Sequence, residues 1–423
     1  MKVMAENVRV QKYFGRHLKS KVYRWNKVSD PRGKRGRRWK RLSELMDAVF
    51  LGFVSRCDSL RNVESMTKGF GKFGRKYVSK RVPDTTLSNL IPRLNVNELR
   101  EQHIAQVKES YRNKELKPVG LPCGVITIDG KGLGALSHDA CGTAQLNHRE
   151  DGSAYYLARQ FRAVLSSAES RPCLDQKAIG AKTNEVADFI PFYSRFVESY
   201  GDNNDLFEIV DVDAGMTSKA NADFIYQSQK AYVMALKENQ PELVLEAKRQ
   251  LGSRRKPEAE TPWESYKGNL IKRQLFRTLE MAGYHDWNHL KQVWRVEQIT
   301  QDKNGKTQSE ERYFLSSLPQ GRLTAEQILL VVRGHWRVEN DCFWSLDMQW
   351  NEDSAPWCTT GRATEILSWI RLMAYNLVQK LRRRTLRKKL PDGTRQSPPA
   401  WNDVFAWINQ AWHISQEANT VRG

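Results

Sequence analysis

The sequence has few of the features that mark secreted, membrane-spanning or zinc-binding proteins. Its 423 residues include six cysteines and no Cys-x-x-Cys pair, so neither a disulfide framework nor a zinc site is indicated. No apolar run approaches the roughly 20 residues that cross a bilayer. The N-terminus is basic and lacks the apolar segment of a signal peptide, so we expect a cytoplasmic protein.

Acidic residues are scarce relative to basic ones. The chain has 68 Lys and Arg against 48 Asp and Glu, which gives a formal net charge of +20. The first fifty residues hold 15 basic and 4 acidic residues, more than half of the excess. A surface that is basic only for solubility would spread this charge, so its concentration favours an anionic polymer as partner.

The pattern of apolar residues changes along the chain. Residues 1–41 are basic and predicted to be irregular, and helical patterns follow, with N-caps such as Ser59. From Pro122, short β-branched runs alternate with helical segments, which predicts an α/β core with parallel strands. Strand patterns around an Asn304-Gly305 turn predict a β-rich insertion within residues 241–321.

Three carboxylates stand where an ionised group is costly. Asp129 and Asp213 each end an apolar strand, and Glu339 lies on the apolar stripe of a helix that begins at Thr324. Each alone is weak evidence, because an Asp can cap a turn or helix and a Glu can pair with a neighbouring arginine. Together, in a basic chain, they suggest divalent cations that act on a phosphate backbone.

Several segments resemble the DDE transposases of bacterial insertion sequences, in the group that includes the H-repeat-associated proteins. The segments are Ile126-Thr-Ile-Asp-Gly-Lys131, Tyr232-Val-Met-Ala-Leu-Lys-Glu-Asn-Gln240, His335-Trp-Arg-Val-Glu-Asn340 and Trp344-Ser-Leu-Asp347. The resemblance spans nearly the whole chain. One departure is Arg337, which stands where the family often has an aliphatic or small residue.

The resemblance implies an RNase H-like catalytic core, interrupted by the β-rich insertion and preceded by a basic helical domain. The implied division is residues 1–118 for DNA binding, 119–240 and 322–380 for the core, 241–321 for the insertion, and 381–423 for a basic tail. The basic run from Lys380 to Lys389, where the core segment passes into this tail, is either a phosphate contact or a flexible segment.

The resemblance also assigns the chemistry. Asp129, Asp213 and Glu339 would be the catalytic and metal-binding triad, holding two Mg²⁺ ions for which Mn²⁺ could substitute. Asp211, two residues before Asp213, is an alternative for the second position. The partners would be double-stranded DNA, both terminal inverted repeats and target, with a dimer or larger assembly on it. DNA contacts are expected from Lys131, Lys237, Asn239, Gln240, Arg333, His335, Asn340, Arg35, Arg37 and Arg38.

Two other functions remain open from the sequence. One is a domesticated DNA-binding protein that has lost the reaction, and the other is a nuclease of the same fold that cuts without joining. All three acids are present, which counts against the first of these.

Overall fold

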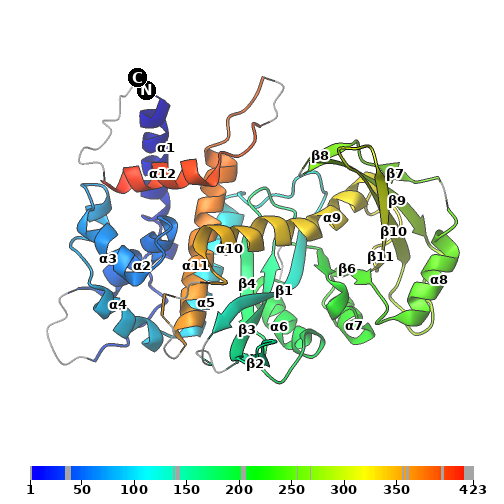
Figure 1. Cartoon of the computed structure of the whole chain (residues 1–423), viewed down its shortest axis with the longest axis horizontal. Helices are drawn as coiled ribbons and strands as arrows, with labels where there is room; N and C mark the ends of the chain where they lie inside the picture. The colour runs from blue at the N-terminus through cyan, green and yellow to red at the C-terminus, as the bar shows by residue number, and fades with distance from the viewer. Residues whose placement is uncertain are drawn as a thin grey trace.

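The computed structural model describes residues 2–33, 40–136, 139, 143–201, 206–254, 256–266, 268–354, 357–358, 362–391 and 395–413. One half of the protein is a bundle of helices, and the other is a large sheet with helices beside it (Figure 1). None of the helices in these ranges has the length and apolar character that a bilayer crossing needs. Within them, the cysteines form no disulfide.

The sheet joins strands from a long stretch of the sequence. Its order is β2-β3-β1-β5-β6-β11-β10-β9-β7, with β4 paired to β3 and β8 to β9. The bounds are β1 Val125–Leu136, β2 Gln145–His148, β3 Ala154–Val164, β4 Cys173–Ala178, β5 Ile209–Val212, β6 Ala231–Leu236, β7 Ala259–Glu260, β8 Glu264–Tyr266, β9 Asn269–Thr278, β10 Gln292–Gln301 and β11 Thr307–Ser316. The mixed α/β class predicted from the sequence is confirmed.

The middle of the sheet is parallel. Strand β5 lies between β1 and β6 and is parallel to both. All four residues of β5 are buried, as expected of a parallel strand that is covered on both faces. The crossovers between parallel strands include α6 (Glu185–Tyr200) and α7 (Lys219–Gln227), each with a side-chain N-cap, Asn184 and Ser218. This arrangement brings the ends of β1 and β5 to one edge.

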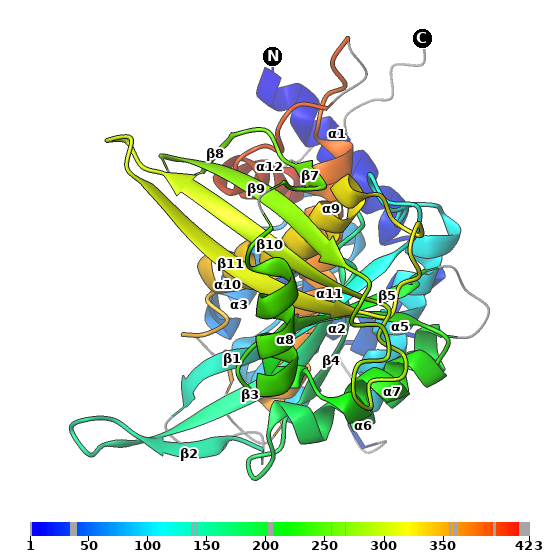
Figure 2. The same ribbon diagram turned by 90° about the vertical axis from the view of Figure 1, so that its right-hand side faces the viewer.

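The strands expected as an insertion extend this same sheet. Strand β11 pairs antiparallel with β6, and β10 and β9 follow as long neighbours (Figure 2). The turn between β10 and β11 includes Gly305 at φ +80°, which confirms the hairpin predicted from Asn304-Gly305. Helix α8 (Pro241–Leu251) lies against β9 and β10. The β-rich region is thus joined to the core by backbone hydrogen bonds.

The helical half is built from both ends of the chain. Its main helices are α1 Lys2–His17, α2 Leu42–Val54, α3 Leu60–Lys68, α4 Asp84–Leu90, α5 Val96–Arg112, α11 Ala363–Lys380 and α12 Trp401–His413. Helix α11 is almost wholly buried and contacts α2 and α5, while α1 contacts α12. One hydrophobic core therefore joins residues of the first hundred to residues 338–412.

Two sequence predictions fail in this half. The segment predicted to be irregular contains α1, whose buried Val10, Tyr13 and Phe14 belong to the shared core, and Phe14 contacts Trp412 of α12. The segment expected as a basic tail supplies α12, which packs on α1. The division of the chain into five functional segments stays a prediction, but these segments share cores.

A nearly continuous helical rod crosses between the two halves (Figure 1). It consists of α9 (Ala325–Arg337), a π-helical turn (Val338–Phe343) and α10 (Trp344–Trp350). Thr324 and Gln327 form the predicted capping box at its start, so that prediction is confirmed. Because the π turn widens the helix, it shifts the side chains that follow onto a new face.

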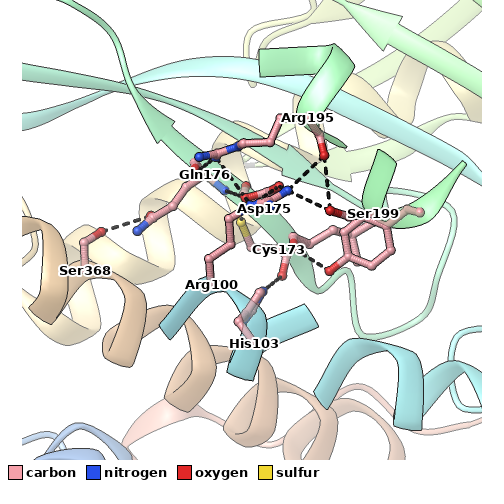
Figure 3. Close-up of polar contacts among 10 residues, drawn as sticks. Arg100, His103, Cys173, Asp175, Gln176, Arg195, Ser199 and Ser368 are labelled. Atoms are coloured by element: carbon pink, nitrogen blue, oxygen red, sulfur yellow. Dashed lines mark hydrogen bonds and ion pairs between the residues drawn. The ribbon is translucent and has the colours of Figure 1, made fainter. Parts of the chain in front are cut away.

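A buried ion-pair cluster joins α5 to β4 and α6 (Figure 3). Asp175 is fully buried, and its carboxylate accepts hydrogen bonds from Arg100 Nε at 3.0 Å and from Arg195 Nη2 at 3.3 Å. Arg100 also donates to Ser199 Oγ at 2.9 Å. Two guanidiniums thus depend on one carboxylate that no water reaches.

Asp175→Asn should therefore destabilise the protein by about 3 kcal/mol, because removing one partner of a buried pair leaves uncompensated charge. Urea denaturation would show a lower midpoint. The exposed Glu150 gives a control, since Glu150→Gln should leave the midpoint unchanged. Equal midpoints for the two variants would contradict this role of Asp175.

Candidate active site

Asp129 and Asp213 lie side by side because two parallel strands reach the same edge. The last paired residues of β1 and β5 are Ile128 and Val212, and each aspartate is the next residue in its chain. Asp213 also caps a short 3-10 turn, accepting a hydrogen bond from the Gly215 amide at 3.4 Å. The carboxyl edge of such a sheet is where open α/β folds place their ligands.

Glu339 approaches this edge from the helical rod. It belongs to the π turn, is exposed, and has no polar partner among the described residues. A cavity of about 630 Å³ lies between the rod and the sheet, and its walls include Asp213, His335 and Glu339. We call this cavity the acid pocket. It also meets Lys237, which follows β6.

The three carboxylates affect one another. Burial is the main cause that raises the pKa of Asp129 to about 7; His335 opposes the rise, and the charges of Glu339 and Asp213 contribute to it. Such coupling acts only over short distances across a partly dry site. The triad predicted from the sequence therefore shares one electrostatic environment.

His335 is a positively charged side chain close to these acids. Its Nδ1 lies 3.0 Å from Asp211 Oδ2, which also accepts a hydrogen bond from Thr127 Oγ1 at 2.9 Å. Burial opposes the charge on His335, but Asp211, followed by Asp129 and Asp213, raises its pKa to about 9. An imidazolium thus faces the aspartates. Asp211 is buried and engaged by His335, so Asp213 is the acid that is open to the pocket.

The acids do not form a ready-made chelate. Within the described ranges, no three His, Cys, Asp or Glu side chains are placed to hold a metal ion. The assignment of Asp129, Asp213 and Glu339 as metal ligands therefore stays a prediction. The donor chemistry nevertheless fits a hard divalent cation, since carboxylate oxygens are its preferred ligands. Their repulsion, expressed in the raised pKa of Asp129, is what a cation would relieve.

A fourth carboxylate, Glu185, escaped the sequence analysis. A Cβ on Gly130 would lie 2.1 Å from Glu185 Oε1, and one on Gly215 would lie 3.2 Å from Oε2. The Glu185 side chain therefore rests on the two glycines that follow the active-site aspartates. Burial raises the pKa of Glu185, Arg159 opposes this, and Asp213 adds to it. The only signal in the sequence was a glycine one or two residues after each aspartate.

Two of the lysines and histidines expected to contact DNA have structural partners instead. The Lys131 ammonium is buried and lies 2.6 Å from both carboxylate oxygens of Asp347 in α10. His335 is buried against Asp211, as described above. Lys237 differs, because it is exposed, lines the acid pocket and has no polar partner in the described part of the chain.

The amides predicted at the site hold loops together. Asn239 donates to the carbonyls of Ala214 and Thr217 at 3.0 and 3.1 Å, and Gln240 donates to Thr217 at 3.3 Å. They tie the loop after β6 to the loop after β5, next to Asp213. Their expected DNA contacts stay predictions.

Some of the remaining residues expected to contact DNA also have partners within the protein. Arg333 pairs with Glu264 of β8. Asn340 is exposed, donates to the Trp336 carbonyl at 2.8 Å and accepts from Tyr266 at 3.3 Å. Arg35, Arg37 and Arg38 lie outside the described residues.

Comparisons with known proteins add independent findings. The chain is similar to YbfL of Escherichia coli (strain K12), with 24% identity over 373 residues, which are 83% of this chain and 90% of that protein. It is also similar to the H repeat-associated protein YhhI of the same strain, with 40% identity over 81 residues, or 19% of this chain and 20% of YhhI.

Among solved structures, the piggyBac transposase synaptic complex with hairpin DNA is similar over 96% of this chain and 79% of that one. The TM-score is 0.44 and the sequence identity 10%, too distant to fix the fold.

A family model described as "Transposase DDE domain" matches residues 162–377, about half of the chain. The match includes Asp213 and Glu339 and begins after Asp129. It confirms the resemblance found in the sequence motifs, and the chain belongs to the family of bacterial insertion-sequence transposases with a DDE domain.

Proposed function

We propose that the protein cuts DNA at the ends of a mobile element and joins the freed 3′-hydroxyls to target DNA. The observation that carries this proposal is that Asp213 and Glu339 line one pocket, and that Asp129, beside Asp213 at the same sheet edge, lies close enough for both charges to raise its pKa. The partial order β4-β3-β1-β5-β6, antiparallel first and parallel after, supports an RNase H-like core.

The triad would hold two divalent cations, Mg²⁺ or in its place Mn²⁺. Such ions, when bound, activate an attacking hydroxyl and stabilise the leaving oxygen of a phosphodiester displacement. Asp129 and Asp213 are fixed by paired strands, whereas Glu339 extends from an exposed turn. Since Glu339 has no polar partner in the described ranges, its carboxylate can turn toward the aspartates without losing a hydrogen bond.

Neighbouring cations have distinct tasks in this proposal. The His335 imidazolium balances the aspartates from below, held in place by Asp211. Lys237 and Lys248 are exposed on the wall of the acid pocket, where they would meet the phosphates that flank the scissile bond. The acids and the lysines thus act on different atoms of the same backbone.

The DNA partners follow from the proposed reaction and from the net charge of +20. Terminal inverted repeats and target DNA would both bind, and two ends would be held by a dimer or larger assembly. Repeat recognition by the basic N-terminal region, and the cytoplasmic location, stay predictions.

Asp129→Ala should reduce cleavage of a labelled element end by more than about 100-fold, because the residue is assigned to the cations. Binding of the same DNA in chelator should stay within twofold of wild type. Strand transfer, measured with a pre-cut end and Mg²⁺, should be lost as well. Glu150→Gln removes an exposed carboxylate and serves as the control.

The same assay separates the alternatives. Cleavage without joined product by the wild-type protein would indicate a nuclease, and binding without cleavage would indicate a non-catalytic DNA-binding protein. Cation-dependent cleavage by Asp129→Ala at the wild-type rate would contradict the assignment of the triad.

Asp129→Asn should make the cation-free protein more stable at about pH 8. A carboxyl whose pKa is raised to about 7 gives stability that is complete below about pH 4 and lost as the pH rises through 7. The amide does not ionise, so the variant should exceed wild type by on the order of 1–3 kcal/mol at pH 8 and by less at pH 5. Thermal denaturation in chelator measures this.

Excess Mg²⁺ should then raise the melting temperature of wild type and leave that of Asp129→Asn nearly unchanged. The same rise in both proteins would show that the cation binds elsewhere. A wild type that is as stable at pH 8 as at pH 5 would show that Asp129 is ionised at little cost.

A further inference from the structure

A second cavity lies on the other side of α9 from the acid pocket. Its volume is about 500 Å³, and the ionisable residues on its walls are Arg171, Arg337, Arg383, Arg387, Arg395 and Glu169. We call it the arginine cleft. Five guanidiniums share its walls with a single carboxylate.

One helix divides the two cavities. Leu330, Gly334 and Arg337 of α9 line the arginine cleft, while Val332 and His335 line the acid pocket. The π turn that follows continues this division, because it presents Glu339 to the acid pocket and Asp341 to the arginines beside the cleft. A ligand in the cleft would therefore lie one helix diameter from the triad.

The arginines outnumber their partners. Asp341 pairs with both Arg171 and Arg383, the latter at 3.1 Å. In the part of the chain that the structure describes, Arg337 has no hydrogen bond or ion pair, and the buried Nε of Arg383 has no acceptor.

Arg387 and Arg395 of the cleft likewise share a single carboxylate. Glu169 pairs with Arg387 at 2.5 Å and with Arg395 at 3.7 Å. Two carboxylates thus serve five guanidiniums that are packed together and partly withdrawn from water.

This crowding is visible in the ionisation of the arginines. Burial, followed by the charges of Arg383 and Arg337, lowers the pKa of Arg171 to about 9. Guanidiniums suit the binding of phosphate, since their planar N–H groups match its oxygens two at a time.

The backbone at Arg171 is also unusual. Arg171 has φ +43°, in the left-handed region that disfavours residues with a Cβ. The turn after β3 fixes this conformation through hydrogen bonds from the Arg171 amide to Ala168 O at 3.2 Å and from the Leu165 amide to Pro172 O at 3.0 Å. Strained backbone of this kind clusters at ligand-binding sites.

We propose that the arginine cleft binds the phosphate backbone of DNA, separately from the acid pocket. Planar guanidiniums match phosphate oxygens two at a time, and a polyanion that passes several phosphates can serve all five. The choice of DNA as occupant rests on the proposed function. Phosphates would take Arg171 and Arg383 from Asp341, two residues from Glu339, so occupation of the cleft would act directly on the turn that carries the third acid.

The test measures binding of a fluorescent DNA duplex in chelator, where no cleavage occurs. Arg337→Gln removes a guanidinium that has no partner to lose, so the fold should tolerate it. It should weaken binding about fivefold to tenfold and reduce the slope of log K against log salt by about one. Combining it with Arg171→Gln should reduce the slope by about two.

The control removes the same charge elsewhere. Arg81 and Arg249 are exposed and each pairs with a surface glutamate, so Arg81→Gln with Arg249→Gln should leave affinity within twofold and the slope unchanged. If the double cleft variant fails to fold, Arg337→Gln and Arg337→Lys decide the matter, and Lys should restore the slope.

The outcomes distinguish the cleft proposal from the proposed reaction. Unchanged binding and slope for Arg337→Gln, with wild-type cleavage intact, would overturn the cleft proposal alone. If Arg337→Gln reduces the slope of log K against log salt, and the wild-type protein binds DNA but never cuts it, the cleft proposal is supported and the proposed reaction is overturned. Tighter binding of a matched RNA duplex would overturn the assignment to DNA, and a wild type that binds no duplex would overturn both proposals.

Discussion

The arrangement of the active site depends on a buried ion pair between the sheet and the helical half. Arg162 of β3 and Glu352, just beyond α10, are both fully buried and joined by two hydrogen bonds of 2.7 Å. Arg371 of α11 donates to the same carboxylate at 3.1 Å. Burial would raise the pKa of Glu352, but the two arginines outweigh it and lower the pKa to about 2. The group therefore stays charged, and neither half can separate without exposing unpaired charge.

This ion pair joins the strand next to Asp129 to the segment that follows the helical rod. Arg162 is the cross-strand neighbour of Asp129, and Glu352 follows the rod that carries Glu339. The Lys131–Asp347 pair makes a second clamp between β1 and α10. Two acids that are 210 positions apart in the sequence are thus connected by ion pairs, which join the strands beside Asp129 to α10 and to Glu352, both of which follow Glu339.

The features that the sequence predicts correctly are those whose interacting residues lie close together in the chain. The Asn304-Gly305 hairpin and the Thr324 capping box are local, and both were predictable from a few neighbouring residues. The aspartates at the strand ends were also readable, because a short apolar run that ends in Asp is a local pattern. In contrast, α1 was missed because its basic composition was misleading, and because α12, which packs against its apolar face, lies some 400 residues away in the sequence.

The site shows the same limit at the level of single residues. Nothing in the sequence indicates a π turn, yet that turn leaves Glu339 exposed and without a polar partner among the residues that the structure describes. Lys131 looked like a phosphate contact because Asp347 lies 216 residues away in the chain. Glu185 was missed because its proximity to the aspartates depends on the crossover of α6, which brings it onto Gly130 and Gly215.

The net charge of +20 does not reveal that acidic and basic side chains are separated on opposite sides of α9. On one side of this helix, burial and then neighbouring carboxylates raise the pKa of Asp129 to about 7, and on the other side burial and then neighbouring guanidiniums lower the pKa of Arg171 to about 9. The Asp341 carboxylate that lies nearest to both sets is already shared between Arg171 and Arg383. The two excesses cannot neutralise each other, because the apolar side chains of α9, including Ile328, Leu329 and Val331, fill the space between them. A phosphodiester backbone with divalent cations supplies what each face lacks, since its phosphates satisfy the arginines and the cations satisfy the acids.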